Sequence, residues 1–383
     1  MRAGPGVQVF VYPEELDAVE PDALTEQILG LGCDSVSIAL AYHRARRVLP
    51  RQGRVSVSPG GAISFTPDPA RYGSLVPTPT APPELRRAVS AFRESCARAG
   101  LRFRAWLVGL HNEPLALAHP DHAARMLDGS STAFSLCPSA GAAVEYIAAL
   151  VGDVCSQLAP EGIDLEAALY PAWEPSYTLT LALEPLSDRA LRYAAQCFCA
   201  SCRHLLGSSA AELESRTRCA AGPPFGSFTR DDPTLADELA RVRAAGVERL
   251  LTAAADAAHL EGSSLCVTSS GPAASAQMRG LGPRSAAAAD RVLLGHGTLA
   301  GPALEQRLLE VRPLAGDREV TVSLNWTPAR TPGAFAAAAE LAAAGGATGL
   351  ALYNLSLVPE AGLHAFRAAA TAFNTRVLRP LDS

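Results

Sequence analysis

Residues 163–169 read IDLEAAL, a short run in which apolar side chains recur at every second position. Successive side chains of a strand point to opposite faces, so this period of two predicts a β-strand. One predicted face is apolar and consists of Ile163, Leu165, Ala167 and Leu169. The opposite face consists of Asp164, Glu166, Ala168 and Tyr170. If the apolar face packs on helices, both carboxylates point into the interior of the sheet.

Seven more β-rich runs recur along the chain, and each is followed by a stretch compatible with an amphipathic helix. The runs are 7–12, 35–41, 101–108, 264–269, 291–294, 319–325 and 349–354. The helical stretches lie near 20–30, 83–99, 140–158, 188–206, 234–260, 302–311, 333–344 and 360–374. Eight strands that alternate with helices predict an α/β fold, the (β/α)8 barrel. A doubly wound open sheet ranks second, because the eight units fill the chain evenly.

The 383 residues are predicted to form a single barrel domain over 1–383, with long insertions after the second, third and fourth strands. The insertion over 43–82 combines a hairpin with a proline-rich loop. Within it, residues 54–65 read RVSVSPGGAISF, and two alternating runs around Pro-Gly-Gly predict the hairpin. A second insertion, 170–262, carries extra helices and a cysteine motif. Gly246 is predicted to cap or interrupt a helix there.

The composition limits the classes of partner. A formal charge of −5, from 33 basic and 38 acidic side chains, argues against a nucleic-acid partner. No apolar run reaches the ~18–20 residues that span a bilayer, so no membrane partner is expected. Residues 1–15 show no secretory pattern, and a cytoplasmic location is expected. The nine cysteines are then expected to be thiols or metal ligands rather than disulfides.

The strongest local motif is Cys197-Phe198-Cys199-Ala200-Ser201-Cys202. This C-x-C-x-x-C spacing brings three sulfurs close enough to bind one metal ion, and a structural zinc site takes four such ligands. The candidates for the fourth ligand are Cys137, Cys155, His204 and Cys219. Without a metal, the same cysteines would be small buried apolar residues on a helix face.

Three segments resemble those of glycoside hydrolases: Leu110-His111-Asn112, Cys137-Pro138 and Cys197–Cys202. Family-42 enzymes are β-galactosidases on a (β/α)8 barrel, in which a Cys-Pro-Asn and a C-x-C-x-x-C segment hold a structural zinc. The chain is also similar to uncharacterised glycoside-hydrolase-like barrel proteins that share all three segments. The resemblance covers mainly residues 100–206. It implies zinc on Cys137, Cys197, Cys199 and Cys202, no organic cofactor, and cleavage of a glycosidic bond.

Two positions differ from the family-42 pattern. Those enzymes place an Asn-Glu pair at the end of strand four and a nucleophilic Glu at strand seven. Here strand four reads GIDLEAA at 162–168, and strand seven ends in Leu324-Asn325-Trp326. A retaining glycosidase needs two carboxylates ~5–5.5 Å apart. The alternative function is therefore a non-hydrolytic barrel that binds a carbohydrate or a protein partner.

Glu166 is the first candidate for the general acid, because an apolar barrel mouth would raise its pKa and let it donate a proton. A purely structural role, paired with a barrel arginine such as Arg104, is the alternative. Glu113 after the third strand, or Glu174 after the fourth, would serve as base or nucleophile. For Glu113 the alternative is a solvated loop residue.

Aromatic and polar residues after the strands predict a pocket for a sugar, whose C–H faces stack on rings while its hydroxyls bind polar groups. The predicted binding residues are Tyr12, Tyr42, His43, His111, Asn112, Tyr170, Trp173, Tyr177, Asn325, Trp326 and Tyr353. The loop aromatics could instead anchor the long insertion, and His111 and Asn112 could fix their loop. The expected partner is a small sugar or glycoside, and homo-oligomerisation is left open.

Residues 295–300 read GHGTLA and fit G-x-G-x-x-A, a pattern that binds phosphate at a helix N-terminus. The match lies outside an N-terminal βαβ unit, so a tight turn is the simpler interpretation. It leaves a phosphate-dependent lyase or isomerase as a third alternative.

Overall fold

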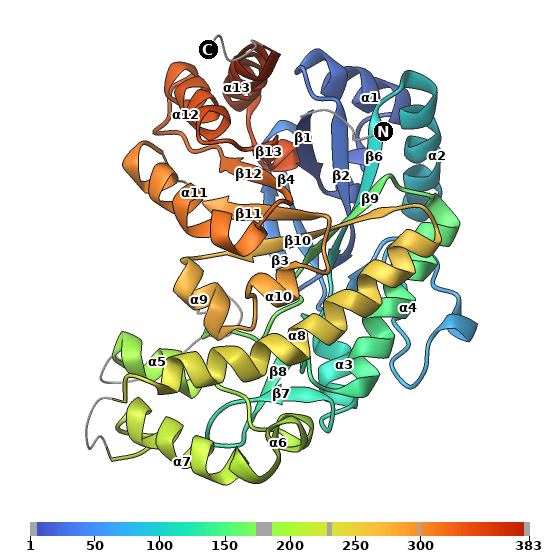
Figure 1. The fold of residues 1–383 in the computed structure, drawn as a ribbon. Helices are drawn as coiled ribbons and strands as arrows, with labels where there is room; N and C mark the ends of the chain where they lie inside the picture. Colours follow the sequence, from blue (N-terminus) through green and yellow to red (C-terminus); the bar gives the residue numbers. More distant parts are fainter. Residues whose placement is uncertain (1–5, 174–185, 228–231, 298–299, 379–383) are drawn as a thin grey trace.

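The computed structural model describes residues 6–173, 186–227, 232–297 and 300–378. Eight parallel strands form a closed barrel (Figure 1). They are β1 (Gly6–Val11), β2 (Ser35–Tyr42), β6 (Arg102–Val108), β9 (Gly162–Glu166), β10 (Ser264–Ser270), β11 (Arg291–Gly297), β12 (Glu319–Asn325) and β13 (Gly349–Tyr353). Neighbours pair in the order β1-β13-β12-β11-β10-β9-β6-β2, and pairing of β1 with β2 closes the ring. The predicted (β/α)8 barrel is confirmed.

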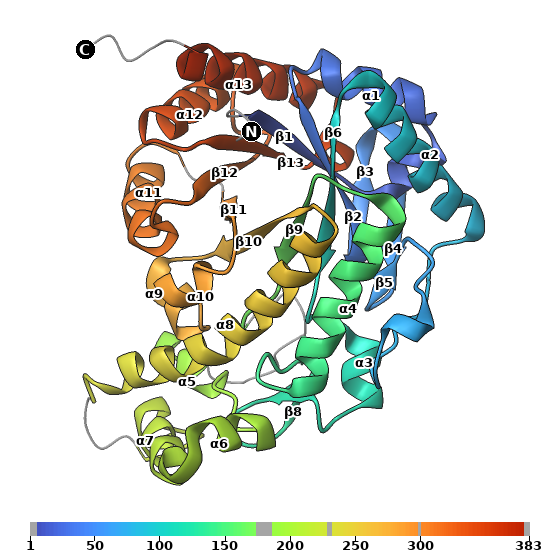
Figure 2. The same cartoon turned by 45° about the vertical axis from the view of Figure 1, so that its right-hand side comes forward.

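Helices surround the barrel on its outer side (Figure 2). The long ones are α1 (Pro21–Gly30), α2 (Pro83–Ala99), α4 (Gly141–Leu158), α8 (Leu235–Leu260), α11 (Pro302–Ala315), α12 (Pro332–Ala344) and α13 (Glu360–Leu378). Shorter ones are α3 (Glu113–Ala118), α9 (Ala273–Met278) and α10 (Pro283–Ala286), with 3-10 turns at Pro13–Asp17, Pro50–Gln52, Pro69–Arg71, Gly207–Ser209 and Leu355–Leu357. Several helices begin at proline. Backbone N–H groups in the first turn of a helix have no acceptor within the helix, so proline, which lacks an N–H, is tolerated there. None of the described helices combines the length and apolar character that crossing a bilayer requires.

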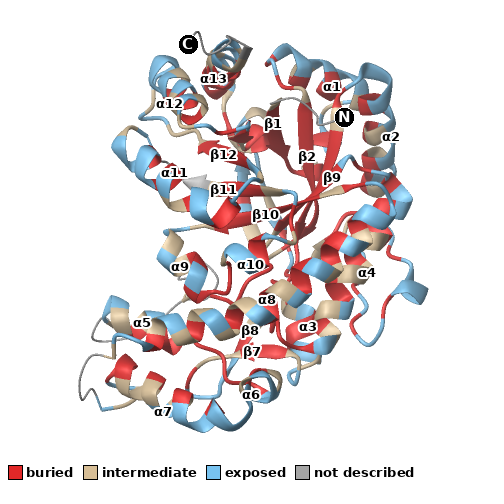
Figure 3. Ribbon diagram, in the orientation of Figure 1, coloured by how far each residue is buried: buried red, intermediate tan, exposed pale blue. Residues whose placement is uncertain are grey.

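Strand alternation divides the buried residues of the barrel into two cores, and the barrel strands are buried almost throughout (Figure 3). Ile163 and Leu165 of β9 lie in the outer core, between the sheet and the helices. A separate cluster fills the barrel lumen: Phe10, Tyr12, Ala39, Tyr42, Trp106, Val108, Ala167, Cys266, Leu293 and Ala351. The lumen is therefore packed with side chains, and its polar residues are concentrated towards the two ends.

A hairpin follows β2 and consists of β3 (Ala45–Leu49) and β4 (Arg54–Ser58), paired antiparallel. The next strand, β5 (Ala62–Ile63), pairs antiparallel with the end of β2 instead. The pairing predicted within 54–65 is therefore wrong. The Pro-Gly-Gly turn joins β4 to β5, but these two strands belong to different sheets.

A group of short elements lies beyond one end of the barrel, against the first half of α8 (Figures 1 and 2). It contains β7 (Ala123–Arg125), β8 (Ser131–Leu136), α5 (Asp188–Ala194), α6 (Ala200–Leu206) and α7 (Ala210–Ala221). Tyr193, Leu213 and Leu239 belong to its own small apolar core. Phe198 of the cysteine motif also belongs to this core, whereas Cys197, Cys199 and Cys202 pack in the main outer core.

Helix α8 runs through Gly246 without interruption, so the break predicted there is wrong. The glycine is needed for a close approach between elements. A Cβ at Gly246 would lie 2.6 Å from Ser139 Oγ and 3.0 Å from the Tyr170 hydroxyl. Helix α8 therefore packs directly on the segments that follow β8 and β9.

Candidate functional site

Strand β9 sends two carboxylates into the lumen, and the deeper one is Asp164. It accepts hydrogen bonds of 2.7 Å from Gln8 Nε2 and Ser37 Oγ, and lies 3.0 Å from Arg104 Nη2 and 2.9 Å from Arg291 Nη2. Burial raises the pKa of Asp164, but the two guanidinium groups outweigh it and hold the pKa well below its usual range. Asp164 is thus a fully engaged, ionised group at the base of the barrel.

Glu166 lies two residues further along, at the C-terminal mouth, and is only partly buried. Trp106 Nε1 donates a hydrogen bond of 2.8 Å to Glu166 Oε2. Arg104, the alternative structural partner considered for Glu166, pairs with Asp164 instead. The C-terminal face is where active sites of this fold are built, so Glu166 is the candidate acid/base group.

Three tyrosines gather around this carboxylate. The Tyr12 hydroxyl lies 3.0 Å from the Tyr42 hydroxyl and 2.9 Å from the Tyr353 hydroxyl. A register shift in β2 brings Tyr42 into the lumen cluster. Burial raises the pKa of all three phenols, and the charge of Glu166 adds to the rise. The phenols therefore stay protonated at neutral pH and can donate hydrogen bonds.

His111 follows β6 and is buried beside the mouth. Burial lowers the pKa of His111 to about 3, and the charges of His43 and Arg279 add to this effect while Glu166 opposes it. The imidazole is therefore neutral at pH 7. His43 is partly exposed, and its ring stacks on Tyr42 with 4.3 Å between the centroids.

The sequence does not single out two residues that belong to the mouth, Trp106 and Arg47. The alternation of residues 101–108 could have indicated Trp106, because it lies on the lumen face of that strand. Arg47, on β3, places its guanidinium 4.0 Å from the Tyr12 ring centroid and 4.7 Å from that of Tyr42. No local pattern indicates that the hairpin folds over these rings.

The predicted lumen position of Tyr170 is wrong. Strand β9 ends at Glu166, and Ala167 then adopts a φ of +53°, which breaks the alternation of the strand. Ala167 joins the lumen cluster, whereas Tyr170 packs in the outer core. The Tyr170 hydroxyl lies 3.7 Å from Cys202 Sγ, so this side chain belongs to the cysteine cluster and not to a sugar pocket.

Asn112 has a structural role in place of the predicted contact with a sugar. Its Oδ1 accepts a hydrogen bond of 3.1 Å from the Leu115 backbone N–H and caps α3, while its Nδ2 donates to the Tyr146 hydroxyl at 3.2 Å. Glu113 is the first residue of α3 and accepts a hydrogen bond of 2.8 Å from Arg44 Nε. The Glu113 side chain is 29% exposed, so this ion pair lies at the surface.

The two site residues predicted at the end of β12, Asn325 and Trp326, lie in different surroundings. Asn325 is in register with Tyr353, and its buried Oδ1 has no hydrogen-bond partner among the described residues. Trp326 instead packs against the outer core and lies close to Gly362 of α13. Of the two residues predicted at the end of strand seven, Asn325 has a free acceptor and Trp326 anchors a helix.

The segment after β9 is described only as far as Trp173. This side chain lines a cavity of about 350 Å³ between α5 and α9, together with Gln196 and Arg279. Two further predicted site residues, Glu174 and Tyr177, lie outside the described residues.

The predicted phosphate-binding turn begins at the end of β11, which finishes at Gly297. Thr298 and Leu299 of this turn lie outside the described residues. Phosphate binding by residues 295–300 therefore stays a prediction.

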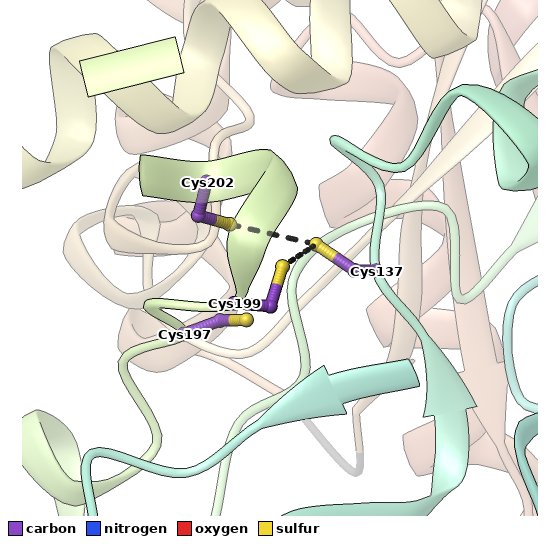
Figure 4. A group of neighbouring side chains, drawn as sticks. All are labelled: Cys137, Cys197, Cys199 and Cys202. Atoms are coloured by element: carbon purple, nitrogen blue, oxygen red, sulfur yellow. Dashed lines mark hydrogen bonds between the residues drawn. The ribbon is translucent and has the colours of Figure 1, made fainter. Parts of the chain in front are cut away.

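Four cysteines from two segments meet in one buried cluster (Figure 4). Cys137 follows β8, and Cys197, Cys199 and Cys202 lie at the start of α6. All four sulfurs lie within 4.8 Å of one another, and Cys137 Sγ is 3.5 Å from the sulfurs of both Cys199 and Cys202. Four sulfurs at ~2.3 Å from a tetrahedral zinc ion would lie roughly 3.8 Å apart. The donor set and its spacing therefore fit one metal ion.

One of the four candidates for the fourth ligand belongs to the cluster, and the other three do not. Cys137 is part of it, whereas Cys155, His204 and Cys219 are not. The backbone N–H of Arg125 donates a hydrogen bond of 3.2 Å to Cys197 Sγ. Such donors stabilise a thiolate, the form of cysteine that binds metals.

A larger cavity, of about 890 Å³, opens at the opposite end of the barrel, around the starts of the strands. Arg104 and Arg291 line it, and both are already paired with Asp164. In this fold the N-terminal end serves stability rather than catalysis. The candidate functional site is therefore the mouth around Glu166.

Comparisons with known proteins agree with this architecture. No protein-family model and no curated protein sequence matches the chain. Among solved structures, it is similar to the catalytic domain of β-amylase from Paenibacillus polymyxa, with 11% identity, a TM-score of 0.59, and coverage of 99% of this chain and 100% of that one. The PgaB (BpsB) glycoside hydrolase domain from Bordetella bronchiseptica gives 14% identity, a TM-score of 0.56, and coverage of 95% and 98%.

A third similar structure is alpha-L-fucosidase isoenzyme 2 from Paenibacillus thiaminolyticus, with 12% identity and a TM-score of 0.55. The match covers 97% of this chain and 49% of the fucosidase chain, so the barrel spans about half of that protein. At these identities the similarity establishes only the fold that the proteins share, a (β/α)8 TIM barrel.

Proposed function

We propose that the protein is a glycoside-hydrolase-like enzyme that cleaves or processes a sugar or a sugar-containing metabolite, with Glu166 as its acid/base group. The observation that carries the proposal is Glu166 itself, a partly exposed carboxylate at the barrel mouth that is oriented by Trp106. Aromatic rings and phenol hydroxyls around a carboxylate suit a pyranose. The fold shared with an amylase, a fucosidase and a glycoside hydrolase domain supports it.

In the proposed reaction, Glu166 donates its proton to the glycosidic oxygen as the C–O bond breaks. Trp106 fixes the orientation of the carboxyl group, and Tyr353 donates a hydrogen bond to a sugar hydroxyl. A second carboxylate activates water or attacks the sugar, and Glu113 or Glu174 would take this role. For Glu113 this requires release from the ion pair with Arg44.

The test is Glu166→Gln, which removes the proton donor and keeps the shape of the side chain. We expect turnover of a panel of nitrophenyl glycosides, with the β-galactoside first, to fall about 10²–10⁴-fold. Glu161→Gln is the matched control, since Glu161 lies just before β9 on the opposite side of the barrel. Equal turnover by wild type and Glu166→Gln would contradict the proposal.

The second candidate is a non-hydrolytic barrel that binds a carbohydrate or a protein partner. It is favoured by Asn325, an amide at the end of β12 where the family-42 enzymes carry their nucleophile, and by the engagement of Glu113 with Arg44. Calorimetry that detects binding of a sugar, with no product released, would support this function. Release of product by the wild-type protein would eliminate it.

For the cysteine cluster we propose a structural zinc ion bound by Cys137, Cys197, Cys199 and Cys202, as in the family-42-like proteins that the chain resembles. Four thiolate ligands leave no open position on the ion, so its role would be to cross-link the segment after β8 to α6. Elemental analysis of purified protein is expected to find about one zinc per chain.

A further inference from the structure

Arg243 of α8 is a buried cation that forms no ion pair with the residues that the structure describes. Its side chain is only 4% exposed, and its Nη2 donates to the Cys197 carbonyl at 3.4 Å. Its Nε and Nη1 are buried and have no hydrogen-bond partner in the described part of the chain. No ion pair to a carboxylate is formed by Arg243 within the same residues. A buried charge that lacks both water and a counter-ion is strongly unfavourable.

This guanidinium lies next to the segment and the ring that border the cysteine cluster. Arg243 lies over the Tyr170 ring at 4.7 Å from its centroid, and the Tyr170 hydroxyl is 3.7 Å from Cys202 Sγ. Arg243, Tyr170, Cys197 and Cys202 also line the same small void. Within the described residues, Arg243 thus forms no ion pair with a carboxylate, but it shares a void with two cysteines of the cluster.

Four thiolates around a divalent ion carry a net charge of −2, whereas four protonated thiols carry none. The net negative charge of the metal-bound form would stabilise a buried guanidinium. We propose that Arg243 is the counter-ion of a divalent metal held by the four cysteines, and that it strengthens metal binding through its positive charge. This inference rests on the proposed zinc site and assigns the site an electrostatic partner.

Two other arginines near the cluster serve as a contrast. Arg203 donates to the Phe198 carbonyl at 2.9 Å and pairs with Glu214, so its charge is already neutralised. Arg249, on the same helix as Arg243, is exposed and donates to the Ser139 carbonyl at 2.6 Å. Water screens the charge of Arg249, which makes it the matched control.

The experiment compares wild type, Arg243→Met, Arg243→Lys and Arg249→Met by competition for Zn²⁺ against a chromogenic chelator. Arg243→Met is expected to bind Zn²⁺ about 10–100-fold more weakly, the usual effect of losing a group that supports metal ligands. Arg243→Lys keeps the charge and should recover most of the affinity, and Arg249→Met should match wild type. The thiolate-to-metal absorption of the Co²⁺-loaded protein reports whether all four sulfurs remain ligands.

A second measurement separates the electrostatic role from simple packing. With metal bound, Arg243→Met should lower the melting temperature; without metal, it should leave the melting temperature unchanged or raise it, because an uncompensated charge has been removed. Equal destabilisation of both forms, or an unchanged Zn²⁺ affinity, would overturn the role of Arg243 while leaving the zinc site standing. A wild-type protein that binds neither Zn²⁺ nor Co²⁺ would overturn both.

Discussion

Asp164 and Glu166 stand two residues apart on β9 and point into the same lumen, yet their surroundings are opposite in character. Asp164 is 1% exposed and is held by two arginines, a glutamine and a serine. Glu166 is partly exposed and is held by the Trp106 indole among aromatic side chains. One strand thus carries a carboxylate at the base of the barrel and another at its mouth.

The difference shows how the depth of a carboxylate in the barrel determines which partners it needs. A carboxylate deep in the lumen is strongly disfavoured unless cations neutralise it, and Arg104 and Arg291 do so for Asp164. A carboxylate at the mouth keeps some contact with water, and the uncharged indole N–H of Trp106 donates a hydrogen bond to Glu166. Asp164, in contrast, is held ionised by its two cationic partners.

The largest effect expected from this comparison concerns the free energy of unfolding. Asp164→Asn removes the carboxylate that pairs with Arg104 and Arg291, whose side chains are 5% and 17% exposed, and we expect it to destabilise the protein by about 3–5 kcal/mol. Glu166→Gln keeps the shape of a partly exposed side chain and should change the stability by less than about 1 kcal/mol. Urea unfolding of both variants, followed by circular dichroism, measures the two values.

Ser37→Ala is the control for Asp164→Asn. It removes one hydrogen bond to Asp164 but leaves both ion pairs, and an effect of about 1 kcal/mol is expected. If Glu166→Gln destabilised the protein as much as Asp164→Asn, this would contradict the expectation that Asp164 stabilises the fold and Glu166 does not.

The next effect in size is a pH dependence that belongs to the mouth. Burial lowers the pKa of His111 to about 3, so between pH ~6.5 and 3 the unfolded chain binds a proton that the folded chain does not. Stability must therefore fall as the pH decreases through this range, by about 1.4 kcal/mol per pH unit from His111. The stability that Asp164 contributes lasts to lower pH, because its pKa is held well below the usual value.

His111→Gln removes the contribution of His111 to the pH dependence of stability, since glutamine does not titrate. The difference in unfolding free energy between wild type and His111→Gln should shrink as the pH is lowered from 6.5 to 4. A difference that stays constant over this range would show that His111 does not titrate as its burial requires.

The alternation of short apolar runs predicts most of the barrel, because each strand must bury one face under helices. It places Asp164 and Glu166 in the lumen correctly, and the same rule applies to Trp106. The rule holds only while the strand continues. It gives a wrong direction for Tyr170, because the backbone turns at Ala167 after the last residue of β9.

Contacts between distant segments are beyond such local rules. The spacing of Cys197–Cys202 predicts three metal ligands, but the presence of Cys137 in the same cluster depends on how the segment after β8 packs against the start of α6. The position of Arg47 over the tyrosines depends in the same way on the fold of a hairpin. The grouping of the four cysteines and the position of the hairpin over the mouth are therefore determined by contacts between segments far apart in the sequence.

The smallest effect tests the turn at Ala167, the point at which the chain leaves the alternation that places both carboxylates. An alanine at a φ of +53° is unfavourable by about 1–2 kcal/mol relative to glycine. The larger backbone entropy of glycine in the unfolded chain offsets about 0.5–1 kcal/mol of this, so Ala167→Gly should stabilise the protein by roughly 0.5–1 kcal/mol. Ala168→Gly is the matched control: Ala168 is buried without a positive φ, and its variant should be destabilised by loss of packing and by backbone entropy. Unfolding midpoints that move in opposite directions are expected. Midpoints that fall equally would show that the backbone at Ala167 is not strained, and that the change of direction after Glu166 has another cause.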